Sequence, residues 1–332
     1  MSFIDQIKNH LMLIKNIKGV ENVVLTQRDG NPIQSLGVWL SKNEIFNLSS
    51  ATSAIYNLAI HLHSNSMKYI LLEGKLAKIL IAPLKNSLED PLDRIMIKQC
   101  IENKNEEFFI SISTIPDVNL GSIFLQTKEC LKEIKRDLII SGETFKPPLR
   151  NFNEEELKKV LNSFNIKDEG NETNRINLYS FAFNSETLDK INLILKELSN
   201  NIIDFDSIFI TLAGGILISK IEKNGNININ FDNYAAMSYS LYSTANRCAW
   251  LLKKMKVSSI LIECEKYFQF ILELGDGIFS ISVLKGKQKL GLIRLLLPRY
   301  LKLLNALLKE TKSIEPTINL ANIKDMVGQI YL

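Results

Sequence analysis

The sequence predicts an α+β fold in which one small unit occurs twice. Helix-like and strand-like segments follow in the same order in both halves of the chain, and matched landmarks lie at nearly constant separation. Thr26 and Thr211 are 185 residues apart, and Glu73 and Glu263 are 190 apart. Separations that change only within loops are typical of a duplicated domain. The 332 residues are enough for about two domains, each with its own core.

Each copy is expected to open on an amphipathic helix. Apolar residues recur there at the 3-4-3 spacing that places them on one helical face. They are Ile4, Ile7, Leu11 and Ile14 in the first copy, and Leu188, Ile191, Leu195 and Leu198 in the second.

A β-hairpin is predicted after each opening helix. In the first copy a strand over 20–26 precedes the turn Arg28-Asp29-Gly30-Asn31, and in the second the turn contains Gly214 and Gly215. These glycines have a structural reason to be there, because such turns need backbone angles that glycine adopts at little cost. A phosphate-binding loop is the alternative, but no Lys-Ser/Thr follows the glycines.

Long middle helices are predicted next, and both are rich in small residues. Small side chains allow close packing, either on the helix's own sheet or between the helices of the two units. They are Ser49, Ser50, Ala51, Ser53 and Ala54 in the first copy, and Ala235, Ala236, Ser238, Ser240 and Ser243 in the second.

Three strands and a final helix complete each predicted unit. The first copy carries an insertion at 85–107, where the second has the tight turn Gly275-Asp276-Gly277. Asp90 and Pro91 favour a short helix inside the insertion, which would cover the sheet edge or contact a partner. Pro298 is expected to interrupt the last helix of the second copy.

The predicted boundaries follow from these segments. Residues 1–140 form the first unit, 141–184 a linker, 185–312 the second unit and 313–332 a C-terminal tail. The linker is expected to hold a short helix over 154–164 and a possible strand over 176–183. The amphipathic tail would fold back on the protein or dock on a partner.

Composition excludes several classes of function. The net charge is only +4 and no basic cluster is interleaved with aromatic residues, so nucleic acid is not an expected partner. No apolar stretch approaches the ~20 residues that span a bilayer, so we expect no membrane insertion. The four cysteines show no CxxC pairing, which favours reduced, buried thiols and a cytoplasmic protein.

Neither copy contains a recognisable catalytic site. The chain has no GxxxxGK[ST] loop, so it is not itself a GTPase. Its histidines are His10, His61 and His63. The His-x-His pair points to two faces of a helix, which is poor geometry for a metal, so surface or interface roles are favoured. No cofactor is expected.

The first copy resembles the roadblock / dynein light chain family. The resemblance rests on GVENVVLTQRDGNPIQS, the long middle helix, KYILLEG, and the start of the last helix at Asn119-Leu120-Gly121. It is weaker in the second copy, where Ala213-Gly214-Gly215 replaces the polar turn. The resemblance implies profilin-like units, each a five-stranded antiparallel sheet with helices on both faces. It also implies that two units pair edge to edge through their second strands, with the middle helices side by side, here as an intramolecular pseudo-dimer.

The resemblance further implies a non-enzymatic regulator or scaffold of a small Ras-like GTPase, or a partner of other roadblock proteins. Some family members are GTPase-activating proteins that reposition the GTPase's own residues. Arg28, at a hairpin tip, is therefore a candidate arginine finger. The expected interdomain or partner interface comprises Gln34, Ser35, Leu36, Ser50, Ser53, Ile218, Ser219, Ala236, Ser240 and Ser243.

Two other functions remain open at this point. A profilin-like sheet also resembles the core of small-molecule sensors, which hold a ligand in an apolar pocket. Alternatively, the chain is a structural assembly subunit that associates with another roadblock protein.

Overall fold

The computed structural model describes residues 3–37, 41–63, 66–84, 108–141, 185–223, 230–252, 256–286 and 290–312. The predicted insertion helix, the linker helix and strand, and the C-terminal tail lie outside these described residues.

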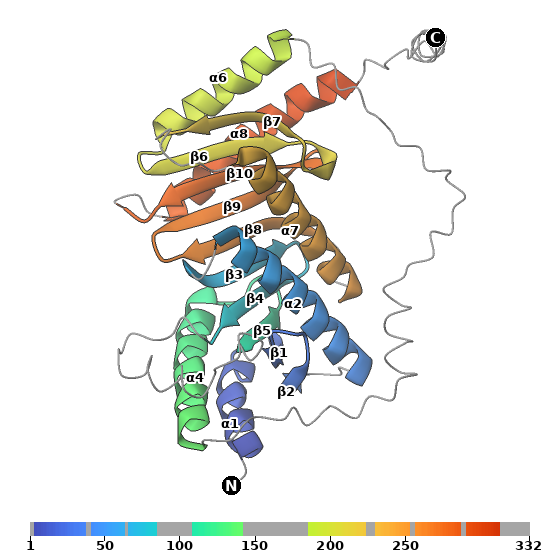
Figure 1. The fold of residues 1–332 in the computed structure, drawn as a ribbon, viewed down its shortest axis with the longest axis vertical. Coiled ribbons are helices and arrows are strands. Elements are labelled where there is room, and N and C mark those ends of the chain that lie inside the picture. Colours follow the sequence, from blue (N-terminus) through green and yellow to red (C-terminus); the bar gives the residue numbers. More distant parts are fainter. Residues whose placement is uncertain are drawn as a thin grey trace, which may run out of the picture.

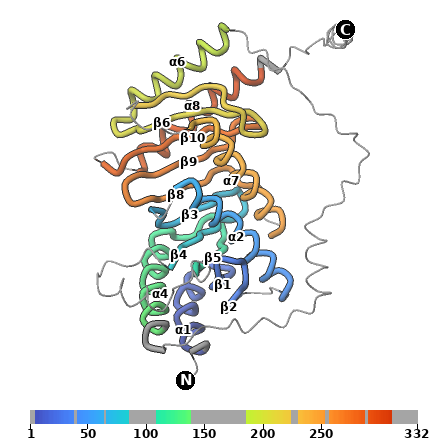
Figure 2. The backbone as a smooth tube through the Cα atoms, in the orientation of Figure 1, coloured from blue at the N-terminus to red at the C-terminus, as the bar shows by residue number. Residues whose placement is uncertain are grey.

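The predicted order of elements is confirmed in both units (Figure 2). The first, unit 1, comprises α1 (Phe3–Lys15), β1 (Val20–Gln27), β2 (Pro32–Gly37), α2 (Lys42–His63), β3 (Met67–Gly74), β4 (Lys78–Pro83), β5 (Phe108–Thr114) and α4 (Leu120–Ser141). The second, unit 2, comprises α6 (Ser185–Asn201), β6 (Phe205–Thr211), β7 (Leu217–Glu222), α7 (Phe231–Leu251), β8 (Val257–Cys264), β9 (Tyr267–Leu274), β10 (Gly277–Leu284) and α8 (Leu290–Lys312). Among the described residues, no helix has the length and apolar character that crossing a membrane requires.

The strands form one antiparallel sheet of ten strands in the order β2-β1-β5-β4-β3-β8-β9-β10-β6-β7 (Figure 1). Each half is a five-stranded sheet in which the strands of one unit lie in the order second, first, fifth, fourth, third. The second half repeats this order starting from its third strand, so the two third strands are neighbours at the middle of the sheet. The two predicted sheets are therefore present, and they are joined within one chain.

The units join through their third strands, so the expected pairing through the second strands is wrong. Leu71 pairs with Leu261 at the centre of the β3–β8 ladder, which we call the seam. The strands β2 and β7 lie at opposite edges of the sheet. The reason is burial: the centres of β3 and β8 are buried, whereas β2 and β7 are mostly half-exposed. A strand that is covered on both faces consists mainly of consecutive apolar residues, as YILL does at 69–72 in β3 and SILI does at 259–262 in β8.

Helices cover both faces of the sheet. One hydrophobic cluster includes the inward sides of α1, α4, α6 and α8, together with Leu71 and Leu261. The other lies beneath α2 and α7 and includes the alternate seam residues Ile70 and Ile262. Both clusters contain residues of both units, so the core continues across the seam.

Two turn predictions are confirmed. Gly30 and Gly215 have φ angles of 93° and 80°, which L side chains rarely adopt. Both also approach the middle helix of their own unit closely. A Cβ on Gly30 would lie 3.2 Å from Ser50 Cα, and a Cβ on Gly215 would lie 2.7 Å from Ala236 Cα.

Pro298 does not interrupt the last helix, contrary to the sequence prediction. The helix α8 continues through it from Leu290 to Lys312. Pro298 is exposed, so water can solvate the Arg294 carbonyl that would otherwise accept a hydrogen bond from residue 298.

Candidate functional site

The middle helices α2 and α7 lie side by side on one face of the sheet (Figure 1). The two helices are therefore in contact across the units, while several of their small residues pack on their own unit, Ser49 against Thr26, Ser53 against the Arg28 carbonyl and Ser238 against Gln269. The exposed and half-buried positions of the pair form a single surface, the α2/α7 surface. Its residues are Ser50, Ala54, Asn57 and His61 of α2, and Ser240, Ser243, Arg247 and Trp250 of α7.

The α2/α7 surface is almost free of charged side chains. From Phe46 to the end of α2 and from Asn233 to the end of α7, Arg247 is the only Asp, Glu, Lys or Arg. By contrast, α4 on the opposite face has seven charged residues. Depletion of charge together with an exposed aromatic residue and Arg is the composition of a protein interface.

Trp250 is the largest exposed side chain of this surface, with 63% of its area accessible. It lies one turn beyond Arg247, so both project from the same side of α7. Trp and Arg are enriched among the residues that dominate binding energy. These two residues were not predicted from the sequence, because their exposure depends on where α7 ends against β8.

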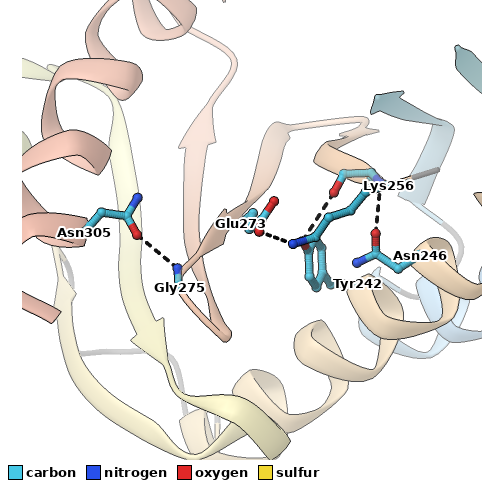
Figure 3. Close-up of polar contacts among 7 residues, drawn as sticks. Tyr242, Asn246, Lys256, Glu273, Gly275 and Asn305 are labelled. Carbon is cyan, nitrogen blue, oxygen red and sulfur yellow. Dashed lines mark hydrogen bonds and ion pairs between the residues drawn. The ribbon is translucent and has the colours of Figure 1, made fainter. Parts of the chain in front are cut away.

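Polar contacts fix the end of α7 that carries Trp250 (Figure 3). The Val257 amide donates to Asn246 Oδ1 at 2.9 Å, and the Tyr242 hydroxyl donates to the Val257 carbonyl at 3.3 Å. Burial raises the pKa of Tyr242 to about 12, so its hydroxyl remains a donor. Next to them, Lys256 forms an ion pair with Glu273. The end of α7 is thereby held to the start of β8.

The hairpin between β1 and β2 is fixed to α2 through Arg28. Its Nε donates to Asn57 Oδ1 at 2.8 Å, and its carbonyl accepts a hydrogen bond from Ser53. The candidate arginine finger therefore folds back onto its own unit. Bringing the guanidinium to a partner would require breaking the contact with Asn57.

Other predicted interface residues are distributed over three places. Gln34, Ser35 and Leu36 lie on β2, and Ile218 and Ser219 on β7, so the structure does not bring these two sets together. Ser219 donates to Asn192 Oδ1 of α6 at 2.5 Å. The remaining predicted residues lie on α2 and α7: Ser50, Ser53, Ala236, Ser240 and Ser243. A role for any of them in binding a partner stays a prediction.

The histidines of α2 differ sharply in environment. His61 is exposed, whereas His63 is buried at the seam, with Nδ1 2.7 Å from the Tyr267 hydroxyl of unit 2. Burial lowers the pKa of His63 to about 4, although interaction with the Gln269 side chain opposes the shift. His63 is therefore neutral at pH 7. Its contact with Tyr267 places one histidine of the pair between the two units.

Charged groups cross the seam on the opposite face of the sheet. Arg294 of α8 lies 3.2 Å from the Glu73 carboxylate, and the Ser259 hydroxyl donates to the same carboxylate at 3.2 Å. Within unit 2, Lys285 pairs with Glu263 at 2.5 Å. The two cations thus compensate the charges of the glutamates near the ends of β3 and β8. Within the described ranges, no cluster of three or more His, Cys, Asp or Glu could hold a metal ion.

No family model matches the sequence, and no curated protein matches it. Several solved structures are similar to it. Myxococcus xanthus MglB is 18% identical, with a TM-score of 0.36, over 41% of this chain and 98% of that one. A Roadblock/LC7 domain from Streptomyces avermitilis is 10% identical, with a TM-score of 0.30, over 39% of this chain and 92% of that one. The gliding protein MglB from Thermus thermophilus is 11% identical, with a TM-score of 0.32, over 42% of this chain and 92% of that one.

These matches each cover about the length of one unit, and they include the roadblock type to which the sequence pointed. The same order of five strands is present in both halves of the sheet.

Proposed function

We propose that this protein is a non-enzymatic regulator or scaffold that binds a small Ras-like GTPase, or a complex containing one, through the α2/α7 surface. The observation that supports the proposal is the near absence of charge over two long neighbouring helices, with Arg247 and Trp250 exposed on one of them. Two helices on a ten-stranded sheet give a broad and rigid platform, which suits a folded partner.

The sequence resemblance to the roadblock family supports the choice of a GTPase as partner. Since this chain has no phosphate-binding loop, the nucleotide would belong to the partner. Any acceleration of hydrolysis would come from repositioning the partner's residues, because Arg28 is held by Asn57. A cytoplasmic location follows from the same proposal.

Within the surface, Trp250 and Arg247 are proposed to supply most of the binding energy. Truncating a well-packed interface Trp costs about 2 kcal/mol or more, which corresponds to a roughly thirtyfold loss of affinity. The small side chains around them would allow the partner's backbone to approach α2 and α7 closely. Their contribution is shape, so single substitutions of Ser240 or Ser243 by Ala should change affinity little.

The test is a pull-down with purified small GTPases from the same cell, loaded with GDP or with a non-hydrolysable GTP analogue. The proposal predicts capture by the full chain and loss of capture with Trp250→Ala. Leu295→Ala is the matched control, because Leu295 is 78% exposed on α8, which packs on the opposite face of the sheet. Failure to capture any GTPase in either nucleotide state would contradict the proposal. Equal loss of capture with Trp250→Ala and Leu295→Ala would show that the binding site is not on α7.

A further inference from the structure

His63 extends from the last turn of α2 into unit 2. Besides the Tyr267 hydroxyl, its ring meets the ring of Tyr234 edge-on, at 6.3 Å between centroids. Only 4% of His63 is accessible. A side chain of unit 1 is thus enclosed by aromatic side chains of unit 2.

The enclosing residues form a polar socket, which we define as Tyr234, Ser238, Tyr267, Gln269 and Ser280. Gln269 is completely buried, and its amide donates to the Ser280 hydroxyl at 3.0 Å and to the Ser238 hydroxyl at 3.4 Å. His63 Nε2 and Gln269 Oε1 are both buried and, among the described residues, neither makes a hydrogen bond of normal geometry. With Nδ1 accepting from the Tyr267 hydroxyl, Nε2 carries the hydrogen, and interaction with Gln269 raises the pKa of His63 against the effect of burial, so a donor of unit 1 lies near an acceptor of unit 2.

The matching positions of unit 1 lack the two tyrosines and the glutamine of this socket, although its two serines correspond to Thr52 and Ser111. The contacts of Gly30 with Ser50 and of Gly215 with Ala236 set an offset of 186 residues between the middle helices. The ladders β3–β4 and β8–β9 set an offset of 190 between the strands. Under these offsets, the counterparts of Tyr234, Tyr267 and Gln269 are Leu48, Ala77 and Ile79, and the counterpart of His63 is Ala249.

We infer that the seam is built to join unit 1 to unit 2 and rejects a pair of two unit 1 domains from separate copies of the chain. In such a pair each His63 would face Leu48, Ala77 and Ile79, which offer no side-chain hydrogen bond. A buried polar group without its partner is strongly disfavoured. In a pair of two unit 2 domains, Gln269 and Tyr267 would face Ala249 and lose the imidazole. The seam thus favours the unit 1–unit 2 pair because each pair of identical units would leave buried polar side chains without hydrogen-bond partners.

The inference is independent of the proposed GTPase partner. It implies that a second copy of the chain can use the seam only by exchanging units, so that each seam still joins unit 1 to unit 2. Assembly without such an exchange would have to use the edge strands β2 and β7 or the helical surfaces.

The test allows the units to choose partners. A protease site is introduced within residues 141–184 of the full chain, and the folded protein is cut. The fragments are then unfolded in urea, refolded together and weighed by native mass spectrometry. The expected product is the complex of two different fragments. His63→Leu should raise the proportion of unit 1 homodimers about tenfold, while the matched control His61→Leu leaves it unchanged.

Homodimers in statistical proportion from the wild-type chain would overturn the inference, as would equal behaviour of the two leucine variants. A second measurement uses the uncut chain and does not depend on fragment refolding. His63→Leu should lower the melting temperature, and adding Gln269→Ile, the residue present at Ile79 in unit 1, should restore at least half of the loss. If Gln269→Ile lowers the melting temperature as much in the His63→Leu variant as in the wild-type chain, the two effects are independent. The socket then does not select His63, and the inference fails.

Discussion

Unit 1 and unit 2 share a strand order but differ beneath their middle helices. Under α2 the Thr26 hydroxyl donates to Ser49 at 3.2 Å, and the rings of Tyr56 and Phe109 lie 4.9 Å apart. Under α7, by contrast, Gln269 is bonded to two buried serine hydroxyls. The polar groups of unit 2 are those that receive His63 of unit 1. The copies have therefore diverged where they meet each other, while the sheet has kept its order.

The opposite face of the seam shows a similar asymmetry. Arg294 of α8 binds Glu73, whereas Phe124, at the corresponding place of α4, packs against Tyr69 with ring centroids 4.5 Å apart. One side of the seam is thus closed by an ion pair and the other by aromatic stacking. Both faces distinguish unit 1 from unit 2.

The strongest destabilisation is expected at the feature that the units share. Leu71→Ala and Leu261→Ala should each reduce the free energy of unfolding by about 2–5 kcal/mol, because both side chains are buried at the centre of the seam. Urea unfolding followed by circular dichroism measures both. Similar losses are expected despite the different units, since the core is continuous. A large loss for one variant alone would show that the units unfold independently.

A smaller effect compares the two hairpin turns. Gly215→Ala should destabilise by about 2–4 kcal/mol and Gly30→Ala by less, because the added Cβ meets helix backbone more closely at Gly215. Gly214→Ala is the control for backbone strain alone, since Gly214 has a φ of 77° and nothing within 4 Å of an added Cβ. Its cost should be about 1–2 kcal/mol, by thermal unfolding. Equal losses of stability at all three glycines would contradict the close approach of the helix backbone to Gly215 and Gly30.

The pH dependence of stability should report His63. Its pKa is lowered to about 4 in the folded chain, so the unfolded chain binds more protons between pH 6.5 and pH 4. The contribution of His63 to stability is complete above pH 6.5. As the pH falls towards 4, the free energy of unfolding decreases by about 2–3 kcal/mol through this residue. The facing Tyr234 and Tyr267 have raised pKa values through burial and stay neutral in this window.

Urea unfolding at pH 7 and pH 4.5 measures this loss in the wild type and in two variants. His63→Leu should flatten the part of the profile that His63 causes, while His61→Leu retains it. An unchanged profile in His63→Leu would assign the pH dependence to other groups.

The weakest effect is expected for Arg28→Ala. Losing the bond to Asn57 should cost about 0.5–1.5 kcal/mol in thermal unfolding. If the protein stimulates GTP hydrolysis by a partner GTPase, Arg28→Ala should leave the stimulated rate unchanged, because Arg28 is engaged within unit 1. A drop in stimulated hydrolysis without a loss of stability would instead support the arginine finger.

Much of the fold could be predicted from sequence because periodicity and turn chemistry are local. The spacing of Ile7, Leu11 and Ile14 specified the buried side of α1, and all three are buried. Gly30 and Gly215 marked the turns. The seam was predicted at the wrong strands, although the continuous apolar centres of β3 and β8 carried the signal. Pairing depends on which edges are covered from both faces, and that is a property of the whole sheet.

The candidate site was predictable only in part. The small residues left open whether α2 and α7 pack on each other or only on their own sheets, and the structure shows the two helices in contact. Arg247 and Trp250 were not identified, because their exposure depends on where α7 ends against β8. The lack of charge along both helices is visible in the sequence and could have indicated the surface. The socket for His63 could not be seen, since Gln269 and Tyr234 come together only through the tertiary fold.

The α2/α7 surface is proposed to bind a small Ras-like GTPase, and calorimetry can decide whether it does. Isothermal titration of the full chain with the captured GTPase, in both nucleotide states, measures the affinity without relying on stability. We predict that Trp250→Ala weakens affinity about thirtyfold or more while Leu295→Ala leaves it unchanged. Unchanged affinity in Trp250→Ala, with a folded protein by circular dichroism, would show that the partner binds elsewhere.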